Sequence, residues 1–113
     1  MKSFLLACVP VVLAIAAAPA AHAADPKIVT YFEETCGVCH GDKGQGTPGL
    51  APAFKGNKFI TASSEAEIAD TITNGREGAA KRYKDLPSPM PKAQVSETRL
   101  KGVIAYMKGE LQQ

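Results

Sequence analysis

The chain has 113 residues, enough for one small domain, and a formal net charge of only +2. This near balance of charge, with no basic run interleaved with aromatic residues, excludes a nucleic-acid-binding surface of the usual kind. A chain this short buries a limited core, so a disulfide, a metal or a bound cofactor is expected to help stabilise the fold.

The first residues predict a secretory signal peptide. Lys2 gives a short positive start, residues 4–18 are almost unbroken in their apolar character, and Ala21-His22-Ala23 fits a small-x-small cleavage site. We therefore expect cleavage after Ala23, export to the periplasm, and a single domain formed by residues 24–113.

Two alternatives to a cleaved signal peptide are disfavoured by the sequence. A retained membrane anchor is disfavoured because the apolar run falls short of the ~20 residues that span a bilayer. Cys8 resembles the cysteine of a lipoprotein cleavage site, but it lies too near Met1 to follow a full apolar region. No stable membrane insertion is expected.

After the signal peptide, the first predicted element is a helix. Asp25 is a typical N-cap and Pro26 suits the first helical position, so they predict a helix that continues through Cys36. Its apolar face is expected to carry Ile28, Tyr31, Phe32 and Thr35. The glycines and prolines between residues 41 and 56 then exclude regular structure.

Two further helices are predicted in the second half of the chain. Ser64 and Glu67 form a capping-box pattern that opens a helix ending at Asn74-Gly75. The proline-rich residues 86–91 must be extended or turned. Ser96 caps a final helix, and its apolar stripe contains Leu100, Val103, Ile104 and Met107, with Tyr106 beside it. No segment alternates as a strand would, so the predicted class is all-α.

The motif Cys36-Gly37-Val38-Cys39-His40 predicts one covalently bound haem c. In this pattern the two cysteines form thioether bonds to the haem and the histidine becomes an axial ligand of the iron. A structural zinc site normally needs four Cys or His ligands, and only three would remain after cleavage. A thioredoxin-like pair expects a βαβ setting, and a plain disulfide gives His40 no role.

A second axial ligand is sought among the methionines. Met107 lies on the apolar stripe of the last helix, where a methionine is more often core packing. Met90 lies in a loop between Pro89 and Pro91, which lower the cost of ordering a thioether at the iron. We therefore predict His40 and Met90 as the axial ligands. A surface methionine in a turn is the alternative for Met90.

Together these motifs resemble the class I bacterial c-type cytochromes over essentially all of residues 24–113. The resemblance implies a small cytochrome c fold, with three to four helices and Gly/Pro-rich loops around one haem. It also implies that the Pro52 carbonyl accepts a hydrogen bond from the His40 ring, which would fix the orientation of that ligand.

The resemblance extends to the crossing of the first and last helices. Phe32 matches the aromatic residue that the family places there, with Val103 and Tyr106 opposite. Ile28 stands where the family often has a smaller residue, which implies a wider crossing.

Several other residues are candidates for the surroundings of the haem. The predicted apolar lining consists of Leu50, Phe54, Phe59, Ile60, Ile72, Leu86 and Leu100. Asn74, Arg76 and Tyr83 are candidates for contact with the haem propionates. Their alternative role is that of a helix cap and solvated side chains.

A histidine–methionine pair saturates the iron and raises its potential, which favours electron transfer over binding of small ligands. We therefore predict a monomeric periplasmic one-electron carrier, not an enzyme, with a protein donor and a protein acceptor. A weakly basic docking face, or else a merely solvated surface, is expected at Lys43, Lys55, Lys58, Lys81, Arg82, Lys84 and Lys92. Two other functions remain open: a haem subunit of a periplasmic oxidoreductase, and a gas-binding or peroxidatic haem protein.

Overall fold

The computed structural model describes residues 13–14, 16–17 and 23–113. Most of the predicted signal peptide therefore lies outside the described residues. The described chain forms helices and loops, and within it no β-strand occurs beyond the isolated bridges Thr47–Ala51 and Arg76–Met90. This confirms the all-α prediction. Among these same residues, no helix is long and apolar enough to cross a membrane.

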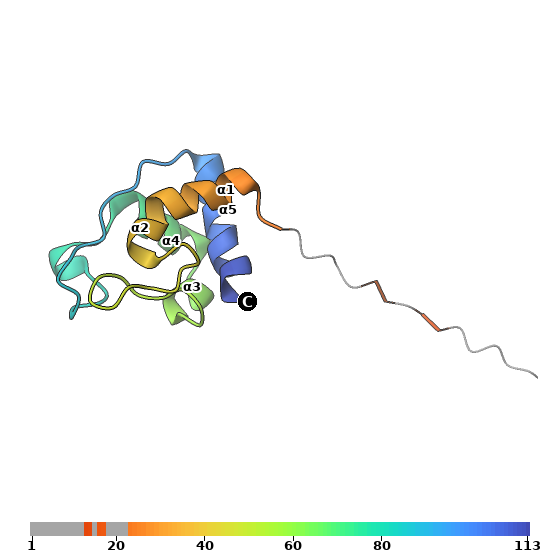
Figure 1. The fold of residues 1–113 in the computed structure, drawn as a ribbon, viewed down its shortest axis with the longest axis horizontal. Coiled ribbons are helices and arrows are strands. Elements are labelled where there is room, and N and C mark those ends of the chain that lie inside the picture. The colour runs from red at the N-terminus through yellow and green to blue at the C-terminus, as the bar shows by residue number, and fades with distance from the viewer. Residues whose placement is uncertain (1–12, 15, 18–22) are drawn as a thin grey trace, which may run out of the picture.

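One continuous helical segment carries the first half of the predicted site. It consists of α1 (Pro26–Tyr31), the π-helical turn η1 (Phe32–Cys36) and α2 (Gly37–His40) (Figure 1). The Asp25 carboxylate accepts a hydrogen bond from the Lys27 amide at 2.8 Å, which confirms the predicted N-cap. The segment runs past Cys36, the predicted end, and stops after His40 because Gly41 leaves the helix at φ 85°.

The π-helical turn changes which side chains face the core. Phe32 is fully buried, as predicted, and its ring packs edge-on against Tyr106 with ring centroids 5.4 Å apart. Thr35, predicted on the same face, is instead exposed. The prediction was wrong because it assumed 3.6 residues per turn, whereas a π-helical turn bonds i to i+5 and rotates the following residues around the axis.

The remaining helical elements are α3 (Lys58–Ala62), α4 (Glu65–Asn74), η2 (Gly78–Ala80), α5 (Glu97–Lys108) and η3 (Glu110–Gln112). The capping box at Ser64 and Glu67 and the N-cap at Ser96 are both present, as predicted. The short helix α3 was not predicted. Its N-cap is Asn57, whose side chain accepts a hydrogen bond from the Phe59 amide at 3.0 Å.

The core lies where α1, α3 and α4 pack against α5. Figure 1 shows α5 behind α1, with α4 and α3 beside it. The predicted stripe of α5 is confirmed at Val103, Ile104 and Met107, while Leu100 is only half-buried. Leu111 in η3 extends this stripe into the last turn of the chain.

The α1–α5 crossing accommodates Ile28 through a glycine on the opposite helix. A Cβ atom added to Gly102 would lie 2.7 Å from Cδ1 of Ile28, closer than packed carbon atoms approach. The small residue is thus on α5 and the large one on α1. This close contact takes the place of the wider crossing that the sequence implied.

Candidate functional site

The two cysteines of the motif lie at the end of the first helical segment. Cys36 is the last residue of η1, and Cys39 lies in α2 directly before His40. Both thiols are free and half-buried. Burial raises the pKa of the Cys36 thiol to about 11, so this group is protonated and not ionised at neutral pH.

The His40 ring is oriented by a backbone carbonyl. Its Nδ1 lies 2.9 Å from the Pro52 carbonyl oxygen, which is the contact that the sequence resemblance implied. Because a carbonyl oxygen can only accept, Nδ1 must carry the proton and Nε2 keeps a free lone pair. Burial lowers the pKa of His40, opposed by the Pro52 hydrogen bond, so the ring is neutral at pH 7. This tautomer is the one that a metal ligand bound through Nε2 requires.

The loop after α2 folds back over the end of that helix. The His40 carbonyl accepts from the Gly46 amide at 2.6 Å, and the Cys39 carbonyl accepts from the Thr47 hydroxyl at 2.7 Å. These contacts satisfy carbonyl groups that a helix end leaves without partners. Phe54, buried further along the loop, places its ring centroid 4.5 Å from that of His40. The loop therefore fixes both the position and the orientation of His40.

The Met90 segment is fastened to the end of α4 by its backbone. The amide of Arg76 donates to the Met90 carbonyl at 2.8 Å, and the amide of Met90 donates to the Arg76 carbonyl at 2.9 Å. A third hydrogen bond joins the Ala93 amide to the Ile72 carbonyl at 2.9 Å. The Met90 side chain is half-buried and packs against the hydrophobic core, so it is not a fully solvated surface residue.

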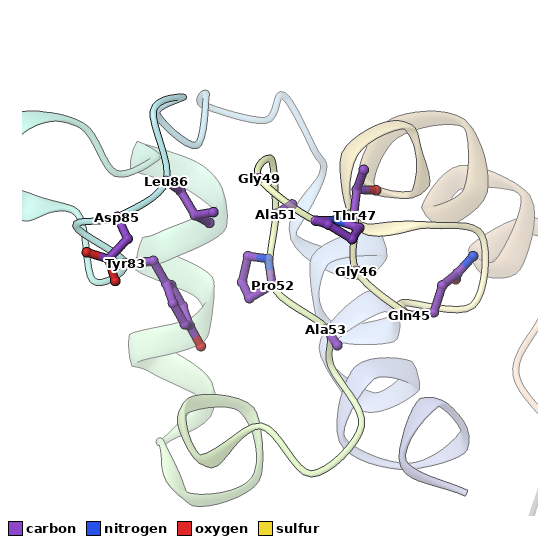
Figure 2. A pocket seen from close by; sticks show the side chains of 11 residues that line it. Gln45, Gly46, Thr47, Gly49, Ala51, Pro52, Ala53, Tyr83, Asp85 and Leu86 are labelled. Carbon is purple, nitrogen blue, oxygen red and sulfur yellow. The ribbon is translucent and has the colours of Figure 1, made fainter.

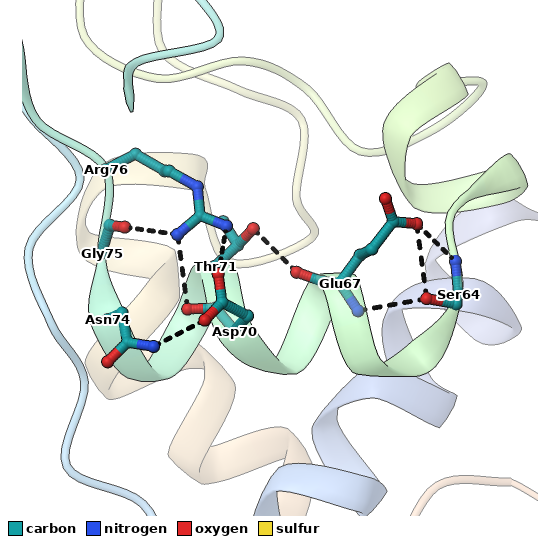
Figure 3. Close-up of polar contacts among 7 residues, drawn as sticks. All are labelled: Ser64, Glu67, Asp70, Thr71, Asn74, Gly75 and Arg76. Carbon is teal, nitrogen blue, oxygen red and sulfur yellow. Dashed lines mark hydrogen bonds and ion pairs between the residues drawn. The ribbon is translucent and has the colours of Figure 1, made fainter. Parts of the chain in front are cut away.

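Asn74 and Arg76 direct their polar groups to a carboxylate on α4 (Figure 3). Asn74 Nδ2 donates to Asp70 Oδ1 at 2.6 Å, and Arg76 Nη2 donates to Asp70 Oδ2 at 2.6 Å. These two hydrogen bonds hold the pKa of the Asp70 carboxyl below its usual range. The arrangement resembles the alternative interpretation, a polar cluster at the end of a helix, more than a free pair of propionate donors.

A pocket lies between the loop of residues 45–53 and the segment of residues 83–86. In Figure 2, Pro52 and Ala53 face Tyr83 and Leu86 across it. Leu86, a predicted lining residue, thus shares this pocket with Pro52, the predicted hydrogen-bond acceptor for His40. Phe59, another predicted lining residue, lies outside the pocket under the guanidinium of Arg82, whose Cζ is 4.2 Å from the ring centroid.

Sequence reasoning did not single out several residues that hold this site together. Asn57 donates from its side chain to the Tyr83 hydroxyl at 2.7 Å, and this bond joins α3 to the far wall of the pocket. The Thr47 hydroxyl, which donates to the Cys39 carbonyl, holds the cysteine–histidine end. Asn57 could have been identified as a potential N-cap before an apolar pair, although this signal does not predict its contact with Tyr83.

The donor set fits a c-type haem. Two free thiols are separated by two residues along the helix, and the following histidine offers an unprotonated Nε2. A half-buried thioether is present at Met90. The chemistry required is thus available: thiols for two thioether bonds, and a nitrogen and a soft sulfur as axial ligands.

Comparison with known proteins identifies the family of this chain. Residues 27–109 match the family described as cytochrome c. A cbb3-type cytochrome c oxidase subunit FixP from Bradyrhizobium sp. (strain ORS 278) is 34% identical over 77 residues, covering 67% of this chain and 24% of that protein. A cbb3-type cytochrome c oxidase subunit CcoP from Azospirillum brasilense is 37% identical over 62 residues, covering 50% of this chain and 21% of that protein.

A second CcoP subunit, from Azospirillum sp. (strain B510), is 35% identical over 55 residues, which are 43% of this chain and 19% of that subunit. The chain therefore spans about a fifth to a quarter of the length of these curated relatives.

Proposed function

Since the chain belongs to the cytochrome c family, we propose that it transfers single electrons with one haem c held by Cys36, Cys39, His40 and Met90. The observation that carries this proposal is the His40–Pro52 hydrogen bond, which leaves Nε2 of the ring free in a residue that directly follows two free cysteines of the same helical segment. When bound, the haem supplies an iron that exchanges one electron between its ferric and ferrous states.

The protein residues contribute rigidity and an apolar environment. The Pro52 carbonyl keeps the His40 ring in one orientation, and the paired backbone of Arg76 and Met90 restrains the thioether. Rigid ligands reduce the reorganisation that accompanies a change of charge. Phe54, which is 5% exposed, limits the access of water to the His40 side and so disfavours the more positive ferric state.

The first experiment is the absorption spectrum of the processed protein, oxidised and reduced, extended into the far red. A weak ferric band arising from sulfur-to-iron charge transfer is expected in the wild type. It should disappear in Met90→Leu and persist in Met107→Leu, which changes the other methionine of the domain while conserving its volume. A missing wild-type band, together with ready binding of carbon monoxide by the ferrous protein, would instead favour a gas-binding or peroxidatic function.

We further propose that the protein works as a free periplasmic carrier after cleavage at Ala23. The signal-peptide pattern and the small size of the domain support this form. The second candidate is a haem subunit of an oxidase complex, and it is favoured by the similarity to cbb3-type cytochrome c oxidase subunits. Gel filtration of a periplasmic extract distinguishes the two candidates. A free carrier elutes as a small monomer, whereas a subunit elutes with a larger assembly or is missing from the extract because it stays with the membrane fraction.

Steering of a redox partner would rest on the basic residues of the loops. Lys43 is paired with Glu33 at 3.4 Å, whereas Lys84 donates to the neutral Ala79 carbonyl at 2.6 Å and not to a carboxylate. Among the described residues, Lys58 and Lys92 have no ion-pair partner. Oxidation by an acidic protein partner should slow as ionic strength rises, and less steeply in Lys58→Gln/Lys92→Gln. A flat dependence in the wild type would contradict the steering proposal.

A further inference from the structure

The last turn of the chain holds the loop that orients His40. Gln112, in η3, makes three hydrogen bonds through its side-chain amide. Its Nε2 donates to the carbonyl oxygens of Phe54 at 2.8 Å and Met107 at 2.9 Å, and its Oε1 accepts from the Gly56 amide at 2.8 Å. The neighbouring Leu111 is buried in the core and anchors this turn. Figure 1 shows the C-terminal end of the chain beside the region that leads into α3.

Both loop partners of Gln112 adjoin the groups that contact His40. The Phe54 ring lies against the His40 ring, and Pro52, two residues earlier, accepts the Nδ1 proton at 2.9 Å. The segment from Pro52 to Gly56 is therefore fixed at one end by His40 and at the other by Gln112.

The Gln112 amide is not needed merely to satisfy these backbone groups. The Phe54 carbonyl already accepts a hydrogen bond from the Asn57 amide at 3.0 Å, and Gly56 is exposed and accessible to water. What the Gln112 contacts add is a connection between this segment and α5, across more than fifty residues of sequence.

We propose that Gln112 is a positioning residue for His40. By joining residues 54–56 to the end of α5, it keeps the Pro52 carbonyl at Nδ1 of His40 and so maintains the tautomer and orientation that ligation through Nε2 requires. This inference rests on the proposed function, because it assigns a purpose to the orientation of His40.

The test uses the haem-loaded, reduced protein and hydrogen exchange followed by NMR. In Gln112→Ala, exchange of the His40 Nδ1 proton and of the Gly56 amide should accelerate about tenfold, as expected when roughly one net hydrogen bond no longer opposes local opening. The Ile104 amide in the core of α5 should keep its wild-type rate. Gln113→Ala, which alters the adjacent exposed side chain, should change none of these rates.

A conservative variant and a second readout separate positioning from general stability. Gln112→Glu retains the acceptor for the Gly56 amide but loses the donor to the Phe54 and Met107 carbonyls and sets a carboxylate oxygen against them. The Gly56 amide should therefore exchange more slowly than in Gln112→Ala, while the His40 Nδ1 proton should exchange at least as fast as in Gln112→Ala. The reduction potential should shift in Gln112→Ala and stay unchanged in Gln113→Ala.

The proposal is overturned if the His40 Nδ1 proton exchanges at the wild-type rate in Gln112→Ala. It is equally overturned if acceleration extends uniformly to Ile104, because that pattern reports global destabilisation. If Gln112→Ala does not fold, Gln112→Glu provides the same comparison. Failure of the proposed function would show separately, as wild-type His40 ring resonances that lack the shift produced by a neighbouring haem.

Discussion

Gly75 should tolerate no side chain, because it lies where the end of α4 meets the Met90 segment. Its backbone has φ 67° and ψ −174°, a region that residues with a Cβ atom rarely adopt. A Cβ atom added there would lie 2.5 Å from the Met90 carbonyl oxygen and 2.9 Å from the Lys92 amide nitrogen. Both contacts are with backbone atoms, so rotation of a side chain cannot relieve them and the Met90 segment must move.

The cost of Gly75→Ala has two parts. The positive φ costs about 1–2 kcal/mol for a residue with a Cβ atom. Displacement of the segment also breaks the paired backbone hydrogen bonds between Arg76 and Met90, each worth about 0.5–1.5 kcal/mol. We expect the free energy of unfolding to fall by roughly 2–5 kcal/mol.

Gly49→Ala is the matched control. Gly49 also has a positive φ, 75°, but an added Cβ atom would meet nothing within 4 Å. Its expected cost is therefore the backbone part alone, about 1–2 kcal/mol. The difference between the two variants isolates the close approach of the Met90 segment.

Urea denaturation of the haem-loaded protein measures the stability difference, and the far-red ferric band reports the methionine. Gly75→Ala should unfold at lower urea and show a weakened band, whereas Gly49→Ala should keep the wild-type band. Equal costs in the two variants would refute the steric reasoning. A large loss of stability with an intact band would show that the pairing of Arg76 with Met90 does not position the thioether.

Three further predictions concern contacts away from the ligands. Gly102→Ala should destabilise the protein by about 0–2 kcal/mol, because overpacking against Ile28 exceeds the gain in helix propensity. The same substitution should be neutral or stabilising in an Ile28→Val background, and a double-mutant cycle by urea denaturation measures this coupling. Asp70→Asn should lower the free energy of unfolding at neutral pH but lose its effect as pH falls below about 3.8, because a carboxyl whose pKa is lowered by folding stabilises only while ionised. Urea denaturation at several pH values tests whether the effect disappears toward low pH. The Ala24 nitrogen lies 3.0 Å from the Glu110 carboxylate, so cleavage after residue 23 would create an ammonium–carboxylate pair; Glu110→Gln should then destabilise a protein starting at Ala24 more than one with an extended N-terminus.

The starts of helices could be predicted because their signals are local. Asp25, Ser64 and Ser96 each accept a hydrogen bond from an amide two or three residues onward, so a short window of sequence contains the whole interaction. Asn57 carries the same N-cap signal at the start of α3. This helix was nevertheless missed, because five residues are too few to show a clear apolar period after the cap.

The internal geometry of the first helical segment could not be predicted in the same way. A π-helical turn differs from an α-helical one by a single residue, and no residue type marks it. Sequence periodicity therefore placed Phe32 correctly but moved Thr35 to the wrong face, since it lies after the onset of the turn. A pattern read at 3.6 residues per turn holds only up to the first change in helix type.

The donor set and its supports differ in how far apart they lie in the sequence. Cys36, Cys39 and His40 are adjacent, so one short motif predicts them together. Gln112 and Phe54 are 58 residues apart, and neither has a feature that identifies the other as its partner. The residues of the motif must lie close together in the sequence because they bind one group. A residue that holds a ligand in place, such as Gln112, needs only to be close to it after the helices have packed. The sequence therefore predicts which groups can ligate, and tertiary structure is needed to predict how firmly they are held.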